Sequence, residues 1–401
     1  MRAGPVLIVA VLAALVAGVW LVARSPAPET PAFAPAGPAA GPPPAPAAAA
    51  REPAPAASAP RAPAGFLPAA LARAFRGAAL PAALGARLAA GDVEGVAAAL
   101  AASTAPGAAA ALSDLAALCA EESQPDAAAG AEQDAIATAG ADAAALALVT
   151  AEIGARHAFR QRILAGCRTA LLDEAAVTAR LRAGGEAGDA ASLERLAARD
   201  PQPLGRMTSA ALLGDAAAQF HLALEYLPRD PRLARSWLEA GARGDADALG
   251  FLGACQLNGC FGAPDPVAAA ATLEAAARQG SRYALGLLAT SGGDDAGRWP
   301  VAGVPVAPLP PRDADALALD PATRYAWSEF ARGLATAGCF GFDFPTTAAA
   351  LVDGAALERD LTAGELAAGR AAATALEHDA GTSARRALGC TGGDAAGRGS
   401  R

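Results

Sequence analysis

Cysteine and histidine are the side chains of this 401-residue chain that are best suited to chemistry, and both are few. Six cysteines occur, an even number that predicts disulfide bonds in an exported protein, with about 15 possible connectivities. Buried free thiols are the alternative, and the spacings do not fit a zinc site. The disulfide candidates are Cys119, Cys167, Cys255, Cys260, Cys339 and Cys390.

The most local pair is Cys255 and Cys260. Two residues five apart in an unbroken helix are too distant to bridge, but Asn258-Gly259 should end the helix between them and bring the sulfurs together. We therefore expect a bridge that holds the inter-helix loop 257–265 in one shape. The phrase Gly-Cys-Phe-Gly occurs at 259–262 and again at 338–341, which predicts two equivalent turns.

The three histidines are His157, His221 and His378. His221 and Glu225 would share a helix face as two metal ligands might, but an exposed helical pair is the preferred interpretation. No zinc-protease, nucleophile-elbow or phosphate-loop motif occurs, and the chain has no lysine for a P-loop or a Schiff base. We assign no catalytic, cofactor-binding or metal-binding residue and expect no cofactor; a Ser–His–Asp triad stays open on spacing alone.

The N-terminal end predicts how the chain is placed in the cell. Residues 6–23 are 18 uncharged apolar residues, borderline for a bilayer span and long for a signal-peptide core. We expect residues 1–23 to be a single-pass inner-membrane anchor with its N-terminus in the cytoplasm and the bulk of the chain in the periplasm. A cleaved signal, giving a secreted or periplasmic protein, is the alternative. Residues 24–64 hold 13 prolines and predict a disordered Pro/Ala-rich linker.

From Phe66 onward, short amphipathic helices alternate with Gly, Pro and Asp, and runs that could form strands are scarce. The predicted fold class is all-α. We divide the chain into a degenerate α-helical region (65–187), repeats (188–290), a loop (291–321), C-terminal helices (322–379) and a disordered tail (380–401).

The repeats are marked by three glycines, 30 and 36 residues apart, that open the same phrase. An alanine follows four residues after each glycine and a leucine eight residues after it. This period is typical of a solenoid of short helix pairs. Asp-Pro at 230–231 and at 265–266 should open the second helix of a pair, and a worn copy starts at Gly188. The repeat-packing residues are Gly214, Ala218, Leu222, Gly244, Ala248, Leu252, Gly280, Ala284 and Leu288.

Here the sequence resembles a known family. The phrase G-D-A-A-A-Q-F-H-L-A-L-E-Y at 214–226 resembles the first helix of a Sel-one-like repeat (SLR), and residues 234–244 resemble the end of its second helix. Gly259 and Asp265 match the family's loop glycine and later aspartate. Over residues 214–286 the resemblance implies a tetratricopeptide-like right-handed superhelix that serves as a protein-interaction scaffold.

The leading functional hypothesis is an exported, membrane-tethered scaffold, not an enzyme, that binds an unknown envelope protein or peptide. Trp237, Trp299 and Tyr226 are possible partner anchors, although core filling is the plainer interpretation. The net charge of −8 argues against nucleic acid. The alternatives are an envelope hydrolase, or an accessory domain of an envelope enzyme, with unidentified catalytic residues, and a purely structural spacer. A scaffold predicts an exposed concave groove, whereas an enzyme predicts a pocket where His, Asp and Glu converge.

Overall fold

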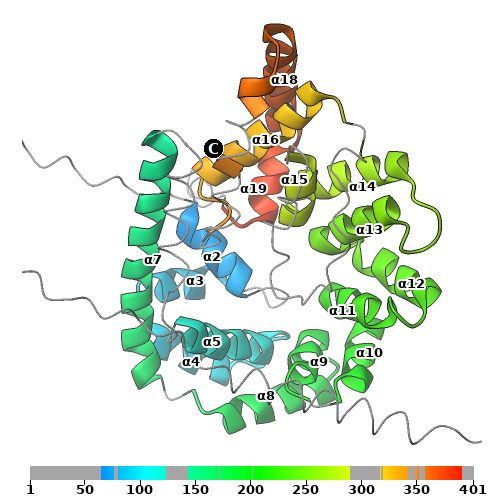
Figure 1. The fold of residues 1–401 in the computed structure, drawn as a ribbon. Coiled ribbons are helices and arrows are strands. Elements are labelled where there is room, and N and C mark those ends of the chain that lie inside the picture. The colour runs from blue at the N-terminus through cyan, green and yellow to red at the C-terminus, as the bar shows by residue number, and fades with distance from the viewer. Residues whose placement is uncertain are drawn as a thin grey trace, which may run out of the picture. The chain divides into compact units, whose positions relative to one another are not determined.

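A computed structural model describes residues 65–75, 80–122, 143–170, 172–200, 202–289, 317, 319–341, 347, 350–351 and 357–390 (Figure 1). Every regular element within these residues is helical, as predicted. The N-terminal part contains α2 (Phe66–Ala74), α3 (Ala82–Ala89), α4 (Val93–Ala102), α5 (Ala108–Glu122), α7 (Ala143–Thr169) and α8 (Glu174–Glu186). The middle part contains α9 (Ala190–Ala197), α10 (Leu204–Leu212), α11 (Ala216–Tyr226), α12 (Pro231–Gly241), α13 (Ala246–Asn258), α14 (Pro266–Arg278) and α15 (Arg282–Ala289). The C-terminal part contains α16 (Pro321–Thr336), α18 (Ala363–Leu376), the π-helical turn η3 (Glu377–Gly381) and α19 (Thr382–Ala387).

The N-terminal helices share one apolar core. Leu115 of α5, Ile163 of α7 and Leu181 of α8 are fully buried in it, together with Val96 of α4. A disulfide between Cys119 and Cys167 fastens α5 to α7, with a Cα–Cα distance of 5.8 Å. The region that the sequence marks as degenerate is therefore a packed helical unit.

The repeat region folds as the predicted helix pairs α11/α12 and α13/α14. The Asp-Pro steps open the second helix of each pair as expected: Asp230 Oδ1 accepts a hydrogen bond from the Leu233 amide at 3.1 Å. Asp265 Oδ1 accepts one from the Ala268 amide at 3.0 Å. Proline suits the first helical position, because its missing N–H would have no partner within the helix.

Small residues allow the paired helices to approach closely. Ala218, Ala248 and Ala284, which share one offset from the repeat glycines, are fully buried. Leu222 and Leu288 are also buried, and Leu252 is half-buried. A Cβ added at Gly241 of α12 would lie only 3.1 Å from the Ala216 carbonyl oxygen of α11. The α11/α12 contact thus needs glycine at this position.

The three repeat glycines do not share one conformation. Gly214 and Gly280 are left-handed, with φ of 91° and 86°. After each, the next amide donates back to a carbonyl five residues earlier, at Ala210 and Ala276. Gly244 keeps a φ outside the left-handed region, and the Asp245 amide donates to Gly241. Equivalent glycines therefore end two helices with a left-handed turn and the third without one.

The helix pairs begin near the predicted limit at 188 and continue past the predicted limit at 290. Helices α9 and α10 pack together as an earlier pair, and α15 packs against α16. Helix α16 opens with the same Asp-Pro step: Asp320 Oδ1 accepts from the Thr323 amide at 3.0 Å, and Pro321 is the first helical residue. Trp327 follows Pro321 by six residues, as Trp237 follows Pro231. The third copy is thus completed by a helix on the far side of the predicted loop 291–321.

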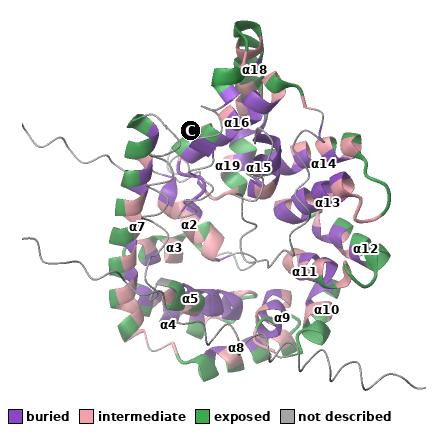
Figure 2. Ribbon diagram, in the orientation of Figure 1, coloured by how far each residue is buried: buried purple, intermediate pink, exposed green. Residues whose placement is uncertain are grey.

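Buried polar contacts join successive copies. Ser281 stands where the first two copies have Asp215 and Asp245. Its Oγ accepts the Ala284 amide at 3.2 Å and donates to the buried Asp247 Oδ1 at 3.0 Å. Ser281 therefore caps α15 and fixes it against α13. In Figure 2, α15 is almost entirely buried.

The inner-membrane localisation expected from the sequence is contradicted. Within the part of the chain that the structure describes, no helix combines the length and apolarity needed to cross a membrane. Helix α7 is long enough, with 27 residues, but it carries Glu152, Arg156 and Arg160. The predicted anchor (1–23) and linker (24–64) lie outside the described residues.

The prediction of a disordered tail from residue 380 is wrong as far as residue 390. Ala380 and Ala384 are buried, and α19 packs against α14. A Cβ added at Gly280, between α14 and α15, would lie 3.1 Å from Leu388 Cγ. Ala380 and Ala384 thus pack as core residues. Residues 391–401 lie outside the described part.

Candidate functional site

The six predicted disulfide candidates divide into two bridges and one pair of thiols. Cys119 is bonded to Cys167, and Cys339 to Cys390. Cys255 and Cys260 are unbonded, so the bridge expected between them is absent from this structure. Backbone hydrogen bonds hold the loop that follows Cys255. Cys260 N–H donates to the Cys255 carbonyl at 3.0 Å, and Asp265 N–H to the Gln256 carbonyl at 2.9 Å.

The two Gly-Cys-Phe-Gly phrases form equivalent turns, as expected. Gly259 and Gly338 have left-handed φ values of 72° and 77°. In each turn the cysteine amide donates to a carbonyl five residues earlier, and the final glycine amide donates to the first glycine at 3.2 Å. A left-handed glycine lets this turn end a helix without steric strain.

The histidines do not converge on one site. His157 lies on α7, His221 on α11 and His378 in η3. Glu225, the suggested metal-ligand partner of His221, pairs with Arg229 at 2.8 Å. Within the described residues, no three His, Cys, Asp or Glu side chains gather to hold a metal ion.

His221 instead borders a buried ion-pair cluster that ties the N-terminal helices to the repeats. Arg195 Nε of α9 lies 2.5 Å from Asp114 Oδ1 of α5, and Arg195 also pairs with Glu194. His221 Nδ1 lies 3.6 Å from Glu194 Oε1, beyond good hydrogen-bonding distance. Asp114 and Glu194 each pair with the oppositely charged Arg195, which is typical of an ion-pair network that stabilises the fold.

Burial sets the electrostatics of this cluster. Burial raises the pKa of the Asp114 carboxyl, against the opposing effect of Arg195. Burial alone would lower the pKa of Arg195. The hydrogen bond to Asp114 and the negative charge of Glu194 outweigh this effect and hold the pKa of Arg195 above its ordinary value. Arg195 thus supplies the positive charge that stabilises the two buried carboxylates.

The possible partner anchors are mostly engaged in packing. Trp237 is half-buried and packs against two apolar clusters, one around Phe251 and one around Leu222. Tyr226 is half-buried against the second of these clusters. Trp299 lies outside the described residues. The packing of Trp237 and Tyr226 agrees with their interpretation as core-filling residues.

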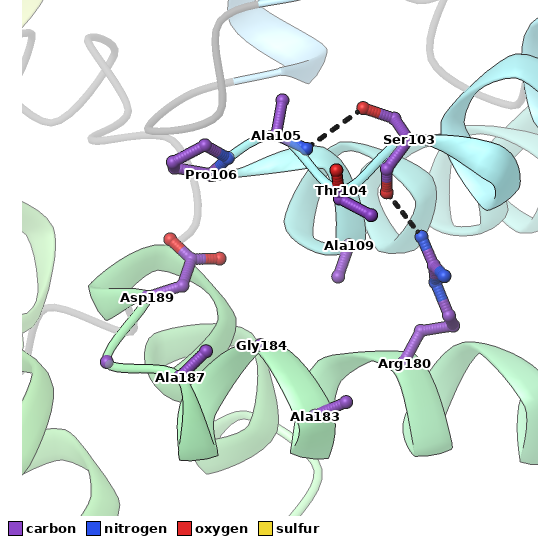
Figure 3. Close-up of a pocket in the computed structure, with 11 residues that line it drawn as sticks. Ser103, Thr104, Ala105, Pro106, Ala109, Arg180, Ala183, Gly184, Ala187 and Asp189 are labelled. Carbon is purple, nitrogen blue, oxygen red and sulfur yellow. Dashed lines mark hydrogen bonds between the residues drawn. The ribbon is translucent and has the colours of Figure 1, made fainter.

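A cavity of about 370 Å³ lies between α8 and the loop that precedes α5 (Figure 3). Arg180 crosses it to donate to the Ser103 carbonyl oxygen at 2.6 Å. Asp189, at the other side, accepts from Ser192. The polar groups are thus occupied by the protein itself, and the rest of the lining is made mainly of small residues such as Ala109 and Gly184. The arrangement offers neither a nucleophile–base pair nor a charged clamp.

An apolar surface lies on α10 and was not anticipated from the sequence. Leu212 and Leu213, at the C-terminal end of α10, are 73% and 55% exposed, and Leu204, in its first turn, is 39% exposed. Arg206 is the only charged residue of this helix. We call Leu204, Leu212 and Leu213 the α10 leucine face.

A comparison of the repeat copies contains the signal that reveals the α10 leucine face. The two residues before the closing glycine are Leu-Leu at 212–213, Ala-Arg at 242–243 and Arg-Gln at 278–279. Arg243 and Gln279, which align with Leu213, are exposed; of the residues that align with Leu212, Arg278 is exposed and Ala242 is half-buried. Leucines at these positions are therefore not needed for packing within the chain.

Comparisons with known proteins add a structural likeness. No family model and no curated protein matches the sequence. A solved structure of a protective antigen present in uropathogenic Escherichia coli strains, which displays an SLR fold, is similar at 19% identity and a TM-score of 0.39. The match covers 54% of this chain and 44% of that protein, so less than half of the latter is represented. The helix pairs are assigned from their own contacts.

Proposed function

We propose that this chain is a helical-repeat scaffold that binds another protein, and that the α10 leucine face is its docking surface. The observation that carries the proposal is the exposure of Leu212 and Leu213, where the other copies carry Ala242-Arg243 and Arg278-Gln279. Contiguous exposed apolar side chains on a soluble surface are typical of interaction sites.

The chemistry of this face defines the partner. The corresponding helix α12 exposes Arg232, Arg235 and Glu239, whereas α10 offers only Arg206, which is engaged with Asp200. A partner that docks here gains little from charge and must present an uncharged apolar segment. Burying one leucine side chain contributes about 1.5–3 kcal/mol, so two central leucines can dominate such an interface.

The test compares two variants of the full chain in which exposed apolar side chains are replaced by serine. The Leu212→Ser, Leu213→Ser variant should lose a crosslinked partner that the parent captures. Val267→Ser, at an 82% exposed position on α14, should retain it. Both variants should melt like the parent, because none of these side chains is buried. Equal capture by the leucine variant and the parent would show that docking occurs elsewhere.

A further inference from the structure

Three cysteines of this protein occupy the same turn at the end of a helix. Cys260, Cys339 and Cys390 each follow a left-handed glycine, with φ of 72°, 77° and 74° for Gly259, Gly338 and Gly389. Their amides donate to the carbonyls of Cys255, Leu334 and Arg385 at 3.0, 2.9 and 2.9 Å. This hydrogen bond brings the side chain after the glycine against the side chain five residues earlier.

The three turns differ in the residue that the cysteine side chain contacts. Cys339 and Cys390 are bonded to each other across a sequence separation of 51 residues. Cys260 meets Cys255, so only in this turn are both contacting positions cysteine. The two thiols belong to one apolar cluster and are unbonded.

The two thiols have unequal surroundings. Cys255 is fully buried in an apolar cluster that contains Phe251, with Tyr283 packed against it. Cys260 is only half-buried, at the edge of the same cluster. The hydrogen bond from Cys255 lowers the pKa of the Cys260 thiol, whereas that hydrogen bond and burial raise the pKa of Cys255. The accessible sulfur is thus the better nucleophile.

We propose that Cys260 and Cys255 form a thiol–disulfide exchange site for low-molecular-weight disulfides, with Cys260 as the attacking thiol and Cys255 as the resolving thiol. The Cys260 thiolate attacks one sulfur of the substrate disulfide, whose S–S bond breaks and releases one thiolate. The Cys255 thiol then gives up its proton, and its sulfur attacks Cys260 Sγ. The second substrate thiolate leaves, and both leaving thiolates take up protons. One substrate disulfide is reduced to two thiols while the two protein thiols become one disulfide.

The fold favours a bond that can open again. The turn is already closed by the hydrogen bonds from Cys260 to Cys255 and from Asp265 to Gln256, so oxidation does not have to assemble it. A bond across so few residues removes little freedom from the unfolded chain, whereas the bridges that span 48 and 51 residues remove much more. The short pair should therefore be reduced first.

The test uses the full chain and dithionitrobenzoate, a small aromatic disulfide that releases a coloured thiolate. The parent should release one thionitrobenzoate ion, then a second, and end with Cys255 and Cys260 joined in one peptide by mass mapping. Cys255→Ser should stop after the first release and keep a stable adduct on Cys260. Cys260→Ser should react at least about tenfold more slowly, because Cys255 is buried.

Several results would overturn the proposal. One is a Cys260→Ser variant that reacts as fast as the parent. Another is a parent that keeps the adduct without forming the internal bond. A misfolded Cys260→Ser variant would expose Cys255 and react faster, so a slow reaction cannot arise from unfolding. Circular-dichroism melting of both serine variants provides the matched control.

Discussion

At the residue scale, the contribution of a charged side chain to stability depends on how deeply that side chain is buried. Arg195 sits between Asp114 and Glu194, which are 7% and 5% exposed at the side chain. Arg235 forms an equally regular pair with Glu239 at 2.7 Å, but both side chains are about half exposed. Water screens the second pair and not the first, so similar contacts should contribute very differently to stability.

Replacing Arg195 by Met should lower the free energy of unfolding by about 3–5 kcal/mol, because two buried carboxylates lose their counter-charge. Arg235→Met, the matched control on the surface, should cost no more than about 0.5 kcal/mol. Urea denaturation of both variants measures the difference. Equal losses would mean that the buried cluster is not a structural network.

At the element scale, short sequence signals predicted most helix ends. The Asp-Pro steps at 230–231 and 265–266 form as expected, and Thr362 and Glu365 form a capping box at the start of α18. The signals are local, because a cap involves only neighbouring residues. The pairing of α15 with α16 was missed, since the two helices are separated by a segment that hides their common register. The Asp320-Pro321 step was the available clue.

Ala248→Trp and Ala284→Trp should each destabilise the fold by about 1–3 kcal/mol. Both alanines are fully buried at the contact between helices, where a larger side chain would be overpacked. Ala217→Trp on α11, at a half-buried neighbouring position, is the milder control. Thermal unfolding that leaves both buried variants unchanged would refute the repeat register.

Asp320→Ala should destabilise α16 by about 1 kcal/mol at neutral pH through loss of its N-terminal cap. Hydrogen bonds from the Thr323 side chain and amide lower the pKa of the Asp320 carboxyl from its ordinary value of 3.8. The carboxylate therefore stabilises the fold above that value, and its contribution is lost as the pH falls through the lower folded-state pKa. The difference in stability between parent and variant should shrink on acidification; a constant difference would contradict the assigned cap.

At the scale of the whole molecule, the two ends of the folded part meet. A Cβ at Gly341 would lie 2.8 Å from the Ala70 amide nitrogen of α2, and one at Gly389 would clash with Ala72 Cβ. Helix α2 thus packs against both turns that the Cys339–Cys390 bond joins. The sequence predicted the helix pairs but not this closure, because contacts between residues so far apart leave no periodic pattern. The α10 leucine face was missed because Leu212 and Leu213 stand out only when the repeat copies are compared position by position.

Replacing Cys339 and Cys390 together by serine should lower stability by about 4 kcal/mol, because the bond closes a loop of 51 residues. The double replacement of Cys255 and Cys260 by serine is the matched control and should cost about 1–3 kcal/mol in the dithiol state, because it buries a hydroxyl at position 255. Denaturation without reductant provides the comparison. A smaller loss for the first variant than for the second would show that the closure of the fold does not depend on the disulfide.

The central claim is that the α10 leucine face binds a partner protein. Hydrogen–deuterium exchange of the full chain, free and in complex with the captured partner, tests it most directly. The account predicts slower exchange in the peptide that covers residues 204–214, with little change around the cavity at 103–109 and 180–189. Unchanged exchange at 204–214, with slowing confined to another surface, would contradict it.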